Sequence, residues 1–160
     1  MKVRPFEEVV ARHGATVLRV CRAVVGPADA EDAWSETFLS ALRAYPALSE
    51  DANVEAWLVT IAHRRALDAG RARTRRAIPV DSVPDRADPG ADPATRDPDL
   101  WTALQRLPAK QRQAVAYHHI AGLPFTEIAT ILGTTPAAAR RASSDGVKAL
   151  RTHYRKDETQ

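Results

Sequence analysis

The chain has 160 residues, 44% of them hydrophobic, which suits one ordinary domain or two small helical ones. Its 23 Lys and Arg nearly balance 20 Asp and Glu, so the formal charge of +3 identifies no partner by itself. The single cysteine, Cys21, excludes an internal disulfide, and no Cys/His cluster has zinc-ligand spacing, so we expect no metal and no cofactor. The apolar stretches are too short for a signal peptide or a membrane span, which predicts a soluble, cytoplasmic protein without membrane insertion.

Two amphipathic helices are predicted in the first 45 residues. Apolar side chains recur at three- and four-residue steps from Phe6 to Val24, and Gly26-Pro27 should end this first helix. Asp29 is a suitable N-cap for the second helix. Its expected inward stripe consists of Ala30, Ala33, Trp34, Thr37, Phe38, Ala41, Leu42 and Tyr45.

A polar loop from Leu48 to Asn53 should lead into a third helix with a strongly basic end. Trp57, Leu58, Ile61 and Ala62 are expected to point inward from this helix. Its later residues carry a cluster of cations against the lone acid Asp68, namely Arg64, Arg65, Arg71, Arg73, Arg75 and Arg76. Such a helix is either a solvated cationic end or a strip that can follow phosphates.

The segment from Ile78 to Asp99 combines repeated prolines and aspartates with few large apolar residues, which predicts a flexible acidic linker between domains. Helical patterns return with Trp101, Leu104 and Leu107, and Pro108 should open a helix that ends at Gly122. Because alternating β-branched runs are nearly absent, the fold class is predicted to be all-α, with two small helical domains.

The C-terminal segment has the pattern of a helix-turn-helix. A short amphipathic helix begins at Phe125 and is closed by Gly133, and Thr135-Pro136 can cap and open the next helix. The expected packing face of this last helix consists of Ala139, Ser143, Val147 and Leu150. The opposite face carries Arg140, Arg141, Ser144, Lys148 and Arg151, which suit phosphates and guanine edges in a major groove. A plain two-helix hairpin with a charged outer face is the structural alternative.

These residues in this order resemble a known family, the extracytoplasmic-function sigma factors of bacterial RNA polymerase. Asp29-Ala30-Glu31-Asp32, Glu36-Thr37-Phe38 and Ala56-Trp57-Leu58 resemble region two of that family. Region four of the family is resembled in the C-terminal half, by the motifs Leu107-Pro108 with Arg112, Gly122-Leu123, Glu127-Ile128-Ala129 and Leu132-Gly133. The resemblance implies region two at residues 1–76, a linker at 77–98, region four at 99–156 and a disordered tail at 157–160.

The resemblance also implies roles and partners. The core-polymerase contact, on the β′ clamp, would be made by Asp29, Glu31, Asp32, Glu36 and Phe38. The −10 promoter element would be opened and read by Asn53, Trp57, Arg64, Arg65 and Arg71. The −35 element would be read by Thr135, Arg140, Arg141, Ser144 and Lys148. Region four would also contact the β flap, the protein would act at the nucleoid, and an anti-sigma factor is left open as a further partner.

The chain departs from the family pattern in its recognition helix, and other functions are compatible with the same residues. The recognition helix differs from its relatives at Ala138-Ala139, at Arg140-Arg141-Ala142 and at Asp145-Gly146, so promoter specificity does not transfer. A stand-alone helix-turn-helix regulator and a protein-interaction module without DNA binding are the alternatives to a sigma factor. An enzyme is not expected, because no carboxylate pair, activated nucleophile or phosphate-binding glycine loop is recognisable.

Overall fold

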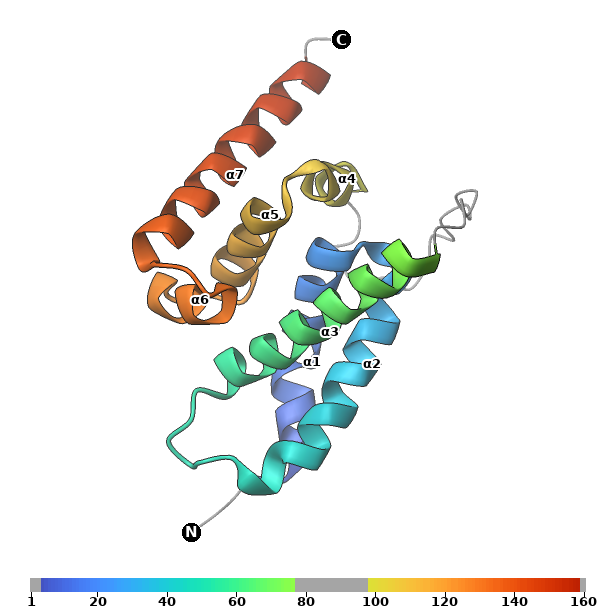
Figure 1. Cartoon of the computed structure of the whole chain (residues 1–160), viewed down its shortest axis with the longest axis vertical. Helices are drawn as coiled ribbons and strands as arrows, with labels where there is room; N and C mark the ends of the chain where they lie inside the picture. Colours follow the sequence, from blue (N-terminus) through green and yellow to red (C-terminus); the bar gives the residue numbers. More distant parts are fainter. Residues whose placement is uncertain (1–3, 77–97, 159–160) are drawn as a thin grey trace.

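A computed structural model describes residues 4–76 and 98–158, which fold into two helical halves that lie side by side (Figure 1). The N-terminal half consists of α1 (Phe6–Val25), α2 (Pro27–Ala44), the short 3₁₀ turn η1 (Tyr45–Ala47) and α3 (Val54–Arg76). The C-terminal half consists of α4 (Pro98–Arg106), α5 (Ala109–Val115), the π-helical turn η3 (Ala116–Ile120), α6 (Phe125–Leu132) and α7 (Pro136–Glu158). No strand occurs in these described ranges, so the all-α prediction is confirmed. The linker predicted at 77–98 lies, apart from Pro98, outside the described residues.

The N-terminal half is a three-helix bundle around Val17, Cys21, Phe38 and Leu58. As expected, α1 ends at Gly26, whose positive φ of 89° suits glycine. The expected cap at Asp29 is wrong, because α2 already begins at Pro27 and its N-cap is Gly26. Proline is well suited to the first helical turn, where its missing N–H would have no intrahelical partner.

One residue of the expected inward stripe on α2 lies outside the core. Ala33, Thr37, Phe38 and Ala41 are buried as predicted, but Leu42 is 51% exposed. Residues 30, 33, 37 and 41 define a narrow seam against α1 and α3, and Leu42 stands one residue beyond it. The outward face of α2 therefore carries more apolar surface than the sequence pattern indicates.

The C-terminal half contains the predicted helix-turn-helix. Trp101, Leu104 and Leu107 are buried as expected. The single helix expected from Pro108 to Gly122 is α5 followed by the π-helical turn, in which Tyr117 is 1% exposed. No described helix is both long and apolar enough to cross a bilayer.

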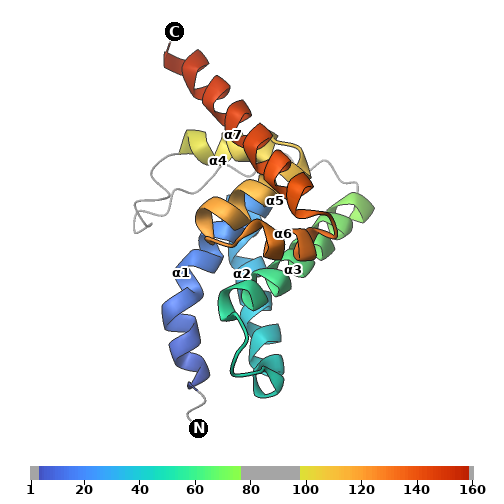
Figure 2. The same cartoon turned by 90° about the vertical axis from the view of Figure 1, so that its left-hand side faces the viewer.

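The two halves are joined by a shared hydrophobic core, which the sequence did not predict. Figure 2 shows α5 and α6 lying over α1 and α3, and α1 also packs with α4 and with the π-helical turn η3. Val59 on α3 is completely buried, although the predicted inward face of this helix did not include it. Ala56, Val59, His63 and Ala66 form a second face of α3, whose apolar residues pack with the C-terminal half. Helix α3 is therefore buried on two sides.

Candidate polymerase and DNA contact surfaces

The outward face of α2 is an acidic surface bordered by leucines. Glu31, Asp32 and Glu36 are exposed, and Leu39 is 56% exposed beside them in sequence. Exposed leucines on the same helix as several carboxylates form an uncommon combination for a solvated helix face, and such patches commonly mark protein contacts. The sequence analysis did not single out Leu39; its place one turn after Ser35-Glu36 was the available signal.

Two predicted members of the polymerase contact are not fully exposed. Phe38 is 6% exposed and packs between Phe6 and Trp34, with ring centroids 6.3 and 4.7 Å away. Asp29 is half-buried near the start of α2. The side chain of Phe38 therefore supports α2 from the core. The outward surface of α2 is formed by the carboxylates and the leucines.

The predicted −10 residues begin at the loop between η1 and α3. Asn53 Oδ1 accepts a hydrogen bond from Ala56 N at 3.1 Å, so Asn53 caps α3. Trp57 is half-buried, with its ring 6.3 Å from the ring of Tyr45. The loop borders a groove of about 330 Å³, which is lined by Arg4, Glu8, Val9, Arg12, His13, Tyr45, Leu48, Ser49, Glu50 and Val54.

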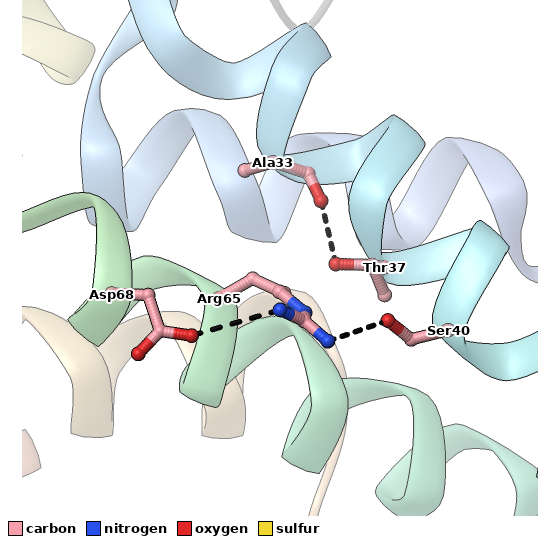
Figure 3. A network of polar contacts seen from close by, with 5 residues as sticks. All are labelled: Ala33, Thr37, Ser40, Arg65 and Asp68. Atoms are coloured by element: carbon pink, nitrogen blue, oxygen red, sulfur yellow. Dashed lines mark hydrogen bonds and ion pairs between the residues drawn. The ribbon is translucent and has the colours of Figure 1, made fainter.

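The predicted cations on α3 differ in their surroundings. Arg64 is exposed, whereas Arg65 donates to Ser40 Oγ on α2 at 2.8 Å and lies 3.7 Å from Asp68 (Figure 3). A guanidinium engaged in this way ties α3 to α2 and has fewer donors left for phosphates. Arg71 belongs to α3, but its side chain lies outside the described part of the chain.

The helix-turn-helix is shaped by local signals that the sequence already carried. Gly133 adopts the left-handed conformation after α6, with φ of 67°. Thr135 Oγ1 accepts a hydrogen bond from Ala138 N at 3.1 Å and so caps α7. Ala139 and Ser143 are buried against the rest of the half, as predicted.

The outward face of α7 is cationic along the first four turns. All of its predicted contact residues are exposed, namely Thr135, Arg140, Arg141, Ser144 and Lys148. The guanidinium of Arg140 lies 5.4 Å from the ring centre of Phe125. The ring of His118 also stacks on Phe125, with the ring centroids 4.1 Å apart. The contact between Arg140 and Phe125 contributes about 0.5–1 kcal/mol and gives Arg140 a defined position.

Gly146 has a packing role that explains its presence in a recognition helix. A Cβ atom at this position would lie 2.6 Å from Val115 Cγ2 and 3.4 Å from the carbonyl oxygen of Gln111. The absence of a side chain therefore lets α7 cross α5 closely. Asp145, the neighbouring departure, is exposed.

Replacing Gly146 by alanine should destabilise the protein by about 1–3 kcal/mol, although alanine favours a helix by about 1 kcal/mol. The reason is the clash with Val115, whose branched side chain has little rotamer freedom. Urea unfolding measures the change. In a Val115→Ala background the cost should shrink, because the clashing methyl is gone. A Gly146→Ala protein more stable than the unsubstituted chain would contradict this account.

Comparisons with known proteins agree with this arrangement. Residues 9–76 match the family model "Sigma-70 region 2", and residues 98–150 match "Sigma-70, region 4". The RNA polymerase sigma factor CarQ of Myxococcus xanthus is 35% identical over 156 residues, covering 91% of this chain and 87% of that protein. The ECF RNA polymerase sigma factor SigD of Mycobacterium tuberculosis is 34% identical over 162 residues, covering 91% and 75%.

Solved structures share the fold across both halves. The sigma factor RpoE of Bartonella quintana, in complex with the anti-sigma factor NepR, aligns with a TM-score of 0.80 at 20% identity, over 96% of this chain and 98% of that chain. CnrH, in complex with the cytosolic domain of CnrY, aligns with a TM-score of 0.67 at 21% identity, over 95% and 88%. The match to region 2 spans the acidic helix α2 and the basic helix α3, and the match to region 4 spans the helix-turn-helix. The chain belongs to the extracytoplasmic-function sigma factors, which bind RNA polymerase and direct it to particular promoters.

Proposed function

We propose that this sigma factor uses separate surfaces for its partners: α2 for core polymerase, the groove and α3 for the −10 element, and α7 for the −35 element. The observation that carries the proposal is the sign of the exposed charge, which is acidic on α2 and basic at Arg64 and on α7. In this layout region two extends over residues 1–76, the linker over 77–98 and region four over 99–156. Residues 157 and 158, which were expected in a disordered tail, still belong to α7.

The polymerase contact is centred on Asp32, Glu36, Leu39 and Leu42. Apolar side chains supply the contact area, and the carboxylates steer the encounter with a basic partner surface. The β′ clamp is the partner surface for α2, and the β flap is the one for the C-terminal half, by resemblance to the family. Phe38 acts indirectly in this proposal, because its ring supports α2 from the core.

The −10 contact combines a place for an unstacked base with a cation for the backbone. The groove beside the α3 loop is lined by Tyr45, Ser49 and Arg12 among others, which together offer an aromatic face, a hydroxyl and a positive charge. The ring of Trp57 lies 6.3 Å from the ring of Tyr45, which itself lines the groove. Strand opening then draws on binding energy for the single strand, so the protein itself performs no catalytic step.

Because Arg64 and Arg65 have different surroundings, alanine variants of the two residues test the −10 assignment. Arg64→Ala should remove one phosphate contact and so release about one counterion fewer on binding. The slope of the logarithm of the promoter binding constant against the logarithm of the salt concentration should therefore become shallower by about 0.9. Arg65→Ala should instead cost about 1 kcal/mol of unfolding free energy, because it loses the bond to Ser40. Salt titration of holoenzyme binding to promoter DNA, together with urea unfolding of the free protein, measures both. Equal slope changes without loss of stability would refute the division between the two arginines.

The −35 contact is assigned to the exposed face of α7. Arg140 and Arg141 can donate pairs of hydrogen bonds to guanine, and Ser144 and Lys148 continue the same helix face. Thr135 caps the helix, so its hydroxyl orients the N-terminal turn that would enter the groove.

Location and regulation follow from this activity. The protein would act in the cytoplasm at the nucleoid, where promoter DNA and polymerase are found. An anti-sigma factor is a further candidate partner, supported by the two structural neighbours whose complexes contain one.

A further inference from the structure

The ring of Phe125 joins three parts of the C-terminal half. Phe125 is the first residue of α6 and is half-buried. The ring of His118, from the π-helical turn, stacks on it with the centroids 4.1 Å apart and the planes 19° from parallel. The guanidinium of Arg140, from the second turn of α7, lies over the same ring at 5.4 Å from its centre. Phe125 therefore connects the π-helical turn with a cation on the last helix.

The ring of His118 is held in place by the backbone. Its Nδ1 lies 2.9 Å from the carbonyl oxygen of Leu123, and because a carbonyl can only accept, Nδ1 carries the proton and donates. The backbone N–H of Leu123 in turn donates to the carbonyl oxygen of Tyr117 at 3.0 Å. The side chain of His118 and the loop before α6 thus fix each other, so His118 supports the ring of Phe125 in one orientation.

The contact with Phe125 leaves the hydrogen-bond donors of Arg140 available. A cation within about 6 Å of a ring centre is attracted by the electrons of the ring face. The N–H donors of a guanidinium lie in its plane, and attraction to a ring consumes none of them. Because Arg140 is exposed, these donors can form paired hydrogen bonds to a base edge while the contact with Phe125 persists.

Arg141 is the neighbouring exposed cation, but its surroundings differ. Among the side chains that the structure describes, no ring lies over Arg141. An arginine without such a contact has several freely rotating bonds, and ordering it on DNA costs conformational entropy. For Arg140 this cost is smaller, because the ring restricts the guanidinium before DNA binds. The two adjacent arginines should therefore differ in how strictly they select a base.

These contacts give two residues outside α7 a role in promoter specificity. We propose that Phe125, supported by His118, is a positioning residue for −35 recognition: it holds the guanidinium of Arg140 where it reads one base pair, and so sets how strictly that pair is selected. This role rests on the proposed assignment of α7 to the −35 element and adds which of its base contacts is preorganised. Phe125 should therefore be coupled energetically to Arg140 and not to Arg141.

The test is a selection of promoter DNA by the holoenzyme that the full chain forms with core polymerase. The probe is a pool of duplexes with randomised −35 and −10 positions, and the base frequencies in the bound fraction give the discrimination at each position. Arg140→Ala should lower discrimination about 10-fold or more at the base pair that Arg140 reads, which identifies this pair. Phe125→Leu should lower discrimination at the same pair by about 2- to 5-fold, the strength of an exposed contact between a cation and a ring, and leave the other positions unchanged.

Matched variants separate positioning from support of the fold. Phe125→Tyr keeps the aromatic face, so it should retain the discrimination that Phe125→Leu loses. His118→Asn keeps an amide donor near the position of Nδ1 but removes the ring, so it should relax the same base pair. In double variants, Phe125→Leu should have no further effect at that pair together with Arg140→Ala, but its full effect together with Arg141→Ala. A purely structural role would instead lower discrimination at all −35 positions and add to the loss from either arginine.

The outcomes distinguish the role of Phe125 from the assignment of α7. If Arg140→Ala leaves discrimination unchanged at every −35 position, the assignment of Arg140 to the −35 element fails, and the role of Phe125 fails with it. If Arg140→Ala relaxes one base pair and Phe125→Leu does not, only the positioning role is overturned. Equal losses in Phe125→Leu and Phe125→Tyr, or losses spread over all −35 positions, would overturn it as well. A His118→Asn protein with unaltered discrimination would exclude His118 from this role.

Discussion

Replacing Asp32 and Glu36 together by arginine should weaken binding to core RNA polymerase by about 100-fold or more. Both carboxylates are exposed on α2 and neither packs in the core, so the fold should survive. Placing two cations against a partner surface that is complementary to carboxylates costs several kcal/mol, and each 1.4 kcal/mol corresponds to about tenfold in affinity. Affinity of the labelled protein for core polymerase, measured by fluorescence anisotropy, gives the change directly.

A charge-matched control separates this surface from the general effect of charge. Glu7→Arg with Glu8→Arg makes the same change of charge at two exposed residues in the first turn of α1. This control should bind core polymerase with nearly unchanged affinity. If the α2 variant binds as well as the unsubstituted chain, or if both variants lose the same affinity, the assignment of α2 to polymerase is refuted.

Replacing Arg140 and Arg141 together by alanine should reduce use of the −35 element by about 10- to 100-fold, because each arginine pair of hydrogen bonds to a base contributes about 1–3 kcal/mol of discrimination. Core polymerase affinity should be nearly unchanged, because the main polymerase contact is assigned to α2 and the two arginines lie on the face of α7 that is assigned to DNA. The measurement is transcription from two templates, one with the natural −35 sequence and one with that sequence scrambled. The unsubstituted protein should distinguish the templates, and the variant should not.

The control for this variant removes two exposed cations elsewhere in the C-terminal half. Arg106→Ala with Lys110→Ala lowers the charge equally, on α4 and α5, and leaves α7 intact. It should retain the difference between the templates. An equal loss of activity on both templates by the Arg140 and Arg141 variant, together with weaker polymerase binding, would mean that α7 supports the fold and does not read DNA.

Features encoded by neighbouring residues could be predicted well. The ends of α1 and α6 were predicted at Gly26 and Gly133, and the cap of α7 at Thr135, because turns and caps depend on a few adjacent residues. The cap at Asp29 was the exception: proline two residues earlier begins the helix by itself.

The candidate site was predicted less completely. The acidic face of α2 could be seen in the sequence, but the exposure of Leu39 and Leu42 depends on how α1 and α3 cover that helix. Arg64 and Arg65 are adjacent and chemically identical, and they are distinguished by the contacts of Arg65 with Ser40 on α2 and with Asp68. The sequence shows Gly146 only as a departure in the recognition helix, whereas the structure explains this glycine by the closeness of Val115.

By itself, the sequence determined that this chain is helical, that it has two family regions, and which helix faces carry charge, because periodicity and caps act over a few residues. The tertiary structure decided that the halves share a core. The stripe of Ala56, Val59, His63 and Ala66 on α3 is too small and too mixed to indicate a buried face from its periodicity. Its burial results from contacts with residues more than 50 positions away, such as Tyr117, and pairing over that distance depends on surface shape, which local patterns do not encode.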